Sequence, residues 1–139
     1  MKYIAKFIYY ILNLTWGGIM TLVGCAAALG LLISGHKPVW NGPCLHFKVG
    51  RNWGGVSLGL VTITDDTPTA EILHHEFGHT LQNAILGPLF IFLVAIPSGI
   101  RYQMFEYRWR HNKPNPDYDS IWFEGTATKY GTKYFDLFK

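Results

Sequence analysis

The sequence AEILHHEFGHTLQN, residues 70–83, decides how the rest of the chain is interpreted. It contains H-E-x-x-H, from His75 to His79, in a segment that its flanking residues predict to be helical. Histidines four residues apart lie one turn apart on the same helix face, where both imidazoles can bind a single Zn²⁺. Glu76 lies beside that point and can exchange a proton with the attacking water. The stretch predicts one catalytic zinc ion, with His75 and His79 as ligands and Glu76 as the general base.

A catalytic zinc needs a third protein ligand and one open position. The long metalloprotease motif would place its third histidine at position 85, where the sequence has Ile85. After His79 the only glutamates are Glu106 and Glu124. Small residues follow Glu124 in FEGTATKYG and would allow a close contact with the zinc helix, so Glu124 is predicted to be the third ligand. The alternatives left open are Asp117, Asp119 and His111.

Start and stop signals bound the predicted zinc helix. The oxygen-bearing side chains of DDT precede Pro68, which suits a first helical position, and Gly87-Pro88 would end the helix. The expected helix therefore covers 68–86. After the loop NKPNPDYDS, a last helix capped by the Asp or Ser that ends this loop is expected to bring Glu124 to the zinc.

Two runs ahead of the zinc helix predict strands and complete an α+β fold class. A short strand over 45–49 and a longer one over 55–64 are expected to pair as a hairpin across GRNWGG. An edge strand beside a zinc helix can pair with an extended peptide, and glycines let a substrate backbone approach closely. The alternative is an ordinary structural hairpin. The candidate substrate-binding residues are Gly55, Val56, Ser57, Leu58 and Gly59.

The N-terminal part of the chain is strongly apolar. Hydrophobic residues make up 49% of the sequence and charged residues only 15%, against about 25% in soluble domains. No charged residue occurs from Phe7 to Ile33, which is about 40 Å of helix against the ~30 Å core of a bilayer. LVGC, residues 22–25, looks like a lipobox, but apolar residues continue after it. A single membrane-spanning helix is expected in a first domain, 1–35, followed by a metal-binding domain, 36–139.

A second apolar run, 84–100, shapes the expected topology. Its continuous part before Pro97 would extend only ~14 Å as a helix, less than half of a bilayer. If the run crossed the membrane, Glu124 and His79 would lie on opposite sides. The run is therefore expected to form a re-entrant or interfacial hairpin broken near Pro97, in an integral protein of the bacterial inner membrane. The basic residues do not determine the catalytic side.

The combination of HHEFGHTLQN with FEGTATKYG resembles the gluzincin clan of zinc metallopeptidases. GGVSLGLVTIT and ILGPLFIFLVAIPSGI are similar to segments of small uncharacterised bacterial membrane proteins of this type. The size is that of minimal gluzincins, with a more distant similarity to CAAX-prenyl and heat-shock membrane endopeptidases. The resemblance covers about residues 53–135. It implies a minimal zincin-like fold, a peptide or protein substrate, and zinc ligation by His75, His79 and Glu124.

Four further side chains are weaker candidates for the site. Asp119 could orient a zinc-binding imidazole. Tyr118, Tyr130 and His111 are candidates to stabilise an oxyanion. For each of them, a packing or solvated role is the alternative.

The sequence thus predicts a membrane-anchored zinc metallopeptidase that acts on a peptide or protein substrate. Two other classes stay open: a non-catalytic zinc-binding membrane protein serving as an adaptor or structural subunit, and a zinc hydrolase of a non-peptide amide. Glu76 favours an enzyme, because a structural site needs no base. The net charge of +3 and the lack of a basic-aromatic groove argue against nucleic acid. The lipid bilayer is an expected partner, and a membrane oligomer or a partner subunit is left open.

Overall fold

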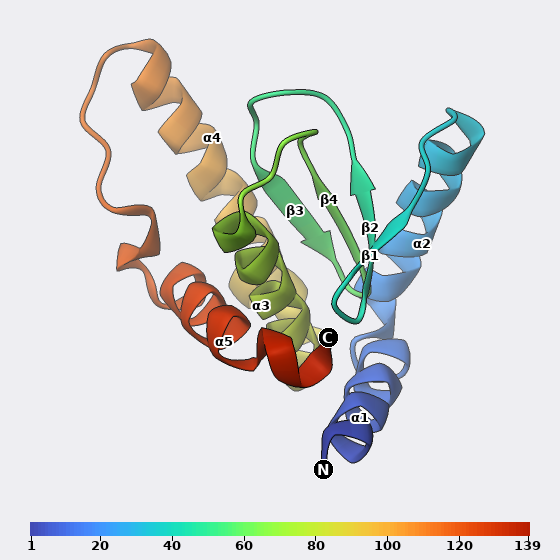
Figure 1. The fold of residues 1–139 in the computed structure, drawn as a ribbon. Helices are drawn as coiled ribbons and strands as arrows, with labels where there is room; N and C mark the ends of the chain where they lie inside the picture. The colour runs from blue at the N-terminus through green and yellow to red at the C-terminus, as the bar shows by residue number, and fades with distance from the viewer.

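A four-stranded mixed sheet lies between helices in the computed structural model, which describes all residues, 1–139. The α+β fold class is confirmed, with five α-helices around this sheet. Helix α2 (Gly18–Ile33) covers one face of the sheet, and α3 (Ala70–Leu86) packs on the other side (Figure 1). Helix α5 (Trp122–Phe138) packs against α3, so that α3 is enclosed between the sheet and α5.

The N-terminal apolar segment forms two helices. Helix α1 (Lys2–Leu14) and α2 meet at an 83° bend, so the prediction of one continuous helix over 7–33 is wrong. The chain at the bend lies close to α3: a Cβ on Gly17 would lie 2.4 Å from the side-chain nitrogen of Asn83. Taken singly, no helix of the structure is long and apolar enough to cross a bilayer, and α1 and α2 reach that length only as a bent pair.

The strands pair in a different way from the one expected. The sheet order is β1-β2-β4-β3, with β2 parallel to β4 and the two outer pairs antiparallel. The hairpin predicted across GRNWGG is wrong, because the run 55–64 itself folds back around Gly59-Leu60 and GRNWGG leads to the edge strand. Gly59 has φ +65° and no room for a Cβ against Thr21 of α2. The strands are β1 (Val39–Asn41), β2 (Cys44–Lys48), β3 (Gly55–Leu58) and β4 (Val61–Thr64).

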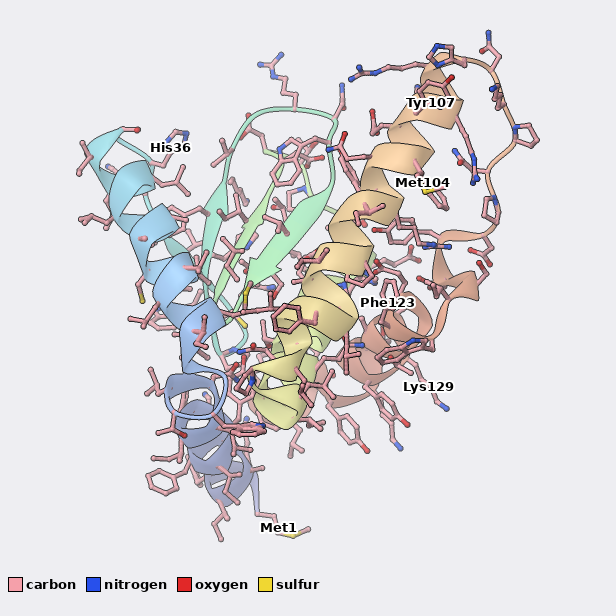
Figure 2. The ribbon with its side chains drawn as sticks, turned by 180° about the vertical axis from the view of Figure 1, so that it is seen from behind. Met1, His36, Met104, Tyr107, Phe123 and Lys129 are labelled. Carbon is pink, nitrogen blue, oxygen red and sulfur yellow. The ribbon has the colours of Figure 1, made fainter.

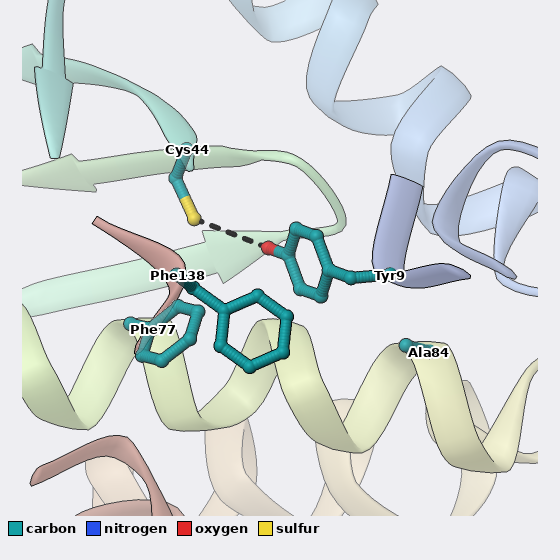
Figure 3. Packing of buried hydrophobic residues seen from close by; sticks show 5 residues of the cluster. All are labelled: Tyr9, Cys44, Phe77, Ala84 and Phe138. Carbon is teal, nitrogen blue, oxygen red and sulfur yellow. Dashed lines mark hydrogen bonds between the residues drawn. The ribbon is translucent and has the colours of Figure 1, made fainter. Parts of the chain in front are cut away.

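The hydrophobic core joins the N-terminal helices to the rest of the chain. On the α2 side of the sheet, Ala28 packs with Phe47 and Val61. A second cluster brings α1, α3, β2 and the end of α5 together (Figure 3). Its members are Tyr9, Cys44, Phe77, Ala84 and Phe138.

The boundaries of α3 and α5 correct two capping predictions. Helix α3 starts at Ala70, two residues later than predicted, because the Thr69 hydroxyl accepts the N–H of Ile72. Its end at Leu86, followed by Gly87, is confirmed. Helix α5 follows a 3₁₀ turn over Tyr118–Ser120 and has no side-chain cap, so capping by Asp119 or Ser120 is wrong.

The apolar run 84–100 does not form a hairpin broken near Pro97. After Gly87 the chain turns once, passes through a π-helical turn, Ile91–Ala95, and continues into α4 (Ile96–Arg110). Pro97 lies in the first turn of α4, where its missing N–H is tolerated, and the wider π turn precedes it. Seen from behind, α2 and α4 flank the sheet (Figure 2).

Candidate metal centre

Helices α3 and α5 approach until their backbones touch. A Cβ on Gly78 would lie 1.9 Å from the carbonyl oxygen of Ala127, and a Cβ on Gly131 would lie 1.9 Å from that of His74. Of the two small residues predicted to permit a close contact, Ala127 lies at it, whereas Gly125 faces the carbonyl oxygen of Asp119 instead. The contact brings Glu124, in the first turn of α5, against the H-E-x-x-H face of α3.

The three predicted ligands meet at one point. Glu124 Oε2 lies 3.0 Å from His75 Nε2 and 3.1 Å from His79 Nε2. One candidate ligand atom from each residue lies within 4.8 Å of the others, as binding to a single ion requires. Glu124 is fully buried and His79 nearly so. The alternative ligands Asp117 and His111 do not join this group.

Gln82 fixes the proton position on His79. Its amide nitrogen donates to the carbonyl of Phe123 at 2.7 Å, so its oxygen is the atom that faces His79 Nδ1, also at 2.7 Å. His79 Nδ1 must therefore carry a hydrogen. In the neutral imidazole this leaves the Nε2 lone pair directed at Glu124.

Thr128 and Asp119 do the same for His75. The Thr128 hydroxyl donates to Asp119 Oδ1 at 3.0 Å, so it accepts from His75 Nδ1 at 2.7 Å. Asp119 was predicted to orient an imidazole, and it reaches His75 through Thr128. The sequence analysis missed Thr128 and Gln82, although each lies one helical turn from a predicted ligand, four residues after Glu124 and three after His79.

The Nε2 lone pairs of His75 and His79 and the carboxylate oxygen of Glu124 repel one another unless a cation or a proton lies between them. Burial raises the pKa of Glu124, but hydrogen bonds with His75 and His79 outweigh it and hold that pKa far below its usual range. Burial lowers the pKa of His79, yet the bond to Glu124 and the nearby carboxylates raise it overall. Ser98 of α4 donates to the other oxygen, Glu124 Oε1, which leaves Oε2 to face the histidines. Ser98 was not among the candidates, because the run 84–100 was expected to be re-entrant or interfacial.

Glu76 lies beside these ligands under the edge strand. A Cβ on Gly55 of β3 would lie 2.8 Å from Glu76 Oε1. The other oxygen, Oε2, is buried and has no hydrogen-bond partner. Burial raises the pKa of Glu76, and the two histidines partly oppose that rise. Glu76 therefore presents an unpartnered buried carboxyl oxygen next to three convergent ligand atoms.

A cleft between β3 and α4 gives access to the site. It consists of two adjoining cavities of about 270 Å³ and 630 Å³. The Tyr102 hydroxyl of α4 donates to the carbonyl of Trp53 at 2.9 Å and bridges the cleft near the histidines. The residues that line both cavities are Trp53, Gly55, His75, Glu76, Tyr102 and Tyr118.

The predicted substrate strand borders this cleft except at its tip. Residues 55–58 of β3 line the first cavity, and β3 is an edge strand of the sheet. Gly59 instead packs on α2.

Of the three candidates for oxyanion stabilisation, only Tyr118 lies at the cleft. Its ring lies 6.0 Å from that of His75, and the Arg101 guanidinium covers it at 5.1 Å while donating to its carbonyl oxygen. Burial raises the pKa of Tyr118, which keeps its hydroxyl protonated. Tyr130 stacks on Tyr134 at the surface of α5, and the exposed His111 follows the end of α4.

No family model, no curated protein and no solved structure matches this chain. The resemblance to gluzincins therefore remains an interpretation of the motif.

Proposed function

We propose that the chain is a membrane-associated zinc metallopeptidase. The observation that carries this proposal is the set of hydrogen bonds made by the two imidazoles. Thr128 and Gln82 each accept from an Nδ1–H, so in the neutral imidazoles both Nε2 lone pairs point at a buried carboxylate oxygen of Glu124. Two neutral imidazoles and one carboxylate are the donor set of a catalytic zinc with an open position.

The residues around this point can divide the work of peptide hydrolysis. His75, His79 and Glu124 would hold the zinc, which would supply a Lewis acid for the substrate carbonyl and for water. Glu76 Oε2, which has no other partner, accepts the proton of the attacking water and returns it to the leaving amine. Tyr118, whose ring and backbone carbonyl contact Arg101, would donate its hydroxyl to the substrate carbonyl oxygen as the charge on that oxygen grows. The free edge of β3 would pair with the extended substrate.

Membrane attachment is supported by the distribution of charge and exposure. Segments 7–35 and 77–100 contain no Asp, Glu, Lys or Arg, and they meet where Trp16 Nε1 donates to the carbonyl of Ile85 at 3.1 Å. Large apolar side chains on both segments are exposed, and a bilayer surface would bury them. They include Ile19, Leu22, Leu29, Leu89, Phe92 and Ile100.

The decisive experiment measures zinc content and peptide hydrolysis together on the purified full chain in detergent. We expect Glu76→Gln to keep stoichiometric zinc and to lose about 10²–10⁴-fold in rate on an unfolded, fluorescently labelled protein. His79→Ala and Glu124→Ala should lose zinc and activity together. Glu106→Gln and His111→Ala are the matched controls, because both residues lie outside the ligand group.

Two outcomes would contradict the proposal. Hydrolysis at the wild-type rate by Glu76→Gln would remove Glu76 from the mechanism. A wild-type chain that binds zinc stoichiometrically and cleaves no peptide would favour the non-catalytic alternative.

A further inference from the structure

The two ends of the cleft are lined by different side chains. At one end, the apolar residues are Met20, Leu58, Phe90, Val94 and Ala95. At the other end, beside Ala70 and Ile72, polar side chains are more numerous, namely Glu71, His74, Asp119, Thr128 and Thr132. His75 and Glu76 lie between the two ends, because both residues line both cavities.

The apolar end is built from the elements that expose apolar side chains to their surroundings. Met20 belongs to α2, and its neighbours Ile19 and Leu22 are exposed. Val94 belongs to the π-helical turn, where Phe92 and Leu93 are exposed. These two elements therefore have one side in the cleft and another side available to lipid. Figure 2 shows α2 and the helix that continues from the π turn on either side of the sheet.

We infer that the substrate is a peptide with a polarity junction: an apolar, membrane-held segment on one side of the scissile bond and a polar segment on the other. This inference rests on the proposed function, and it names the substrate class of the same site. The apolar segment enters from the side of α2 and the π turn and lies against Met20, Val94 and Leu58. The polar segment leaves past Glu71 and Thr132. There, side-chain hydrogen bonds compensate its polar groups for the contacts with water that they lose.

One position allows the apolar end to be narrowed without disturbing the ligands. Gly99 of α4 lines the cavity, and a Cβ there meets no atom within 4 Å, so Gly99→Leu would fill part of the cleft. Gly30 of α2 is the matched control. It is also a helical glycine with open space around its Cβ, and it does not line the cleft.

The experiment uses the zinc-loaded full chain in phosphatidylcholine vesicles with three quenched fluorogenic peptides. All three share one central sequence. One is polar on both sides, one has a leucine-rich half, and one contains the same residues as the second in scrambled order. We expect the junction peptide to have a kcat/KM at least about tenfold above those of the other two, the scale of discrimination that apolar pockets provide. Gly99→Leu should reduce cleavage of the junction peptide more than that of the polar peptide, and Gly30→Leu should match the wild type.

The outcomes separate this inference from the function on which it rests. Equal kcat/KM values for the three peptides would overturn the substrate class while leaving a peptidase. If the zinc-loaded chain cleaves none of the three peptides, the proposed function fails. The binding of the peptides to the Glu76→Gln variant then tests the substrate class separately. Fluorescence anisotropy with that variant should show tighter binding of the junction peptide than of the polar one, and equal binding would overturn the inference as well.

Discussion

Helix α3 has two helical neighbours, and it contacts them in opposite ways. Against α5 the backbones touch, because Gly78 and Gly131 have no side chains to separate the helices. Against α1 the helices are linked by side-chain hydrogen bonds. Tyr9 bonds to Thr80 at 2.6 Å, and the Asn83 amide donates to Asn13 Oδ1 at 2.7 Å.

This difference reflects what each contact has to achieve. A metal ion tolerates little variation in ligand distance, and backbone contact leaves α3 and α5 a single separation. The α1 contact carries no ligand. Small residues and interhelical hydrogen bonds both hold helices together where apolar surroundings give no hydrophobic driving force between them. The α5 contact therefore sets the geometry of the candidate site, and the α1 contact fixes the apolar N-terminal segment to it.

The largest effect is expected from adding a single methyl group at the α5 contact. In Gly78→Ala the new Cβ would lie 1.9 Å from the Ala127 carbonyl oxygen, so the helices must separate. We expect a loss of about 1–3 kcal/mol in unfolding free energy and of at least about 100-fold in zinc affinity. Displacing a ligand from the metal should weaken zinc binding more than removing a group that only orients a ligand, which costs about 10–100-fold. Chelator competition and chemical denaturation in detergent measure the two quantities.

The control for this change is Gly99→Ala, where the new methyl group meets nothing within 4 Å. It should leave zinc affinity unchanged and stabilise the helix by about 0.5–1 kcal/mol. If Gly78→Ala binds zinc as tightly as Gly99→Ala does, backbone contact does not set the ligand geometry.

A smaller effect is expected from the groups that orient the imidazoles from the α5 side. Thr128→Val keeps the side-chain shape but removes the hydroxyl that accepts from His75 Nδ1 and links it to Asp119. Losses of about 10–100-fold in metal affinity are typical for such orienting groups. Thr132→Val, one turn further along α5 and exposed, should retain wild-type affinity. A Thr128→Val variant with unchanged zinc affinity would show that Thr128 does not orient His75.

The parts of this site that the sequence predicted depend on local spacing. H-E-x-x-H places two ligands on one helix face whatever surrounds it, and only two glutamates follow His79 as candidates for the third ligand. Thr128 and Ser98 could not be assigned roles, because each acts on a ligand of another helix. Gln82 lies on the same helix as His79, but its contact with Phe123 of α5 decides which of its amide atoms faces the imidazole.

The wrong fold predictions share a similar cause. An alternating pattern over 55–64 suits one long strand or two short ones, and the contact of Gly59 with α2 decides for two. The bend after α1 and the unbroken start of α4 at Pro97 likewise depend on contacts and backbone geometry that hydropathy does not record.

The smallest effect is expected at the α1 contact. The Thr80 hydroxyl donates to the carbonyl of Phe77, so it accepts from the Tyr9 hydroxyl. Tyr9→Phe keeps the ring packed against Phe138 (Figure 3) and leaves Thr80 without that donor. We expect a loss of about 1 kcal/mol in unfolding free energy and no change in zinc affinity.

The double variant with Thr80→Val tests whether this loss belongs to the pair. Removing both hydroxyls should cost less than the sum of the two single changes, because neither hydroxyl is then left without the other, and only the weakly bonding Cys44 thiol loses its partners. The coupling energy of a double-mutant cycle, measured by denaturation, checks this expectation. If Tyr9→Phe instead weakens zinc binding as much as Thr128→Val does, the two contacts of α3 are not separable. The ligand geometry would then depend on the N-terminal helices as strongly as on α5.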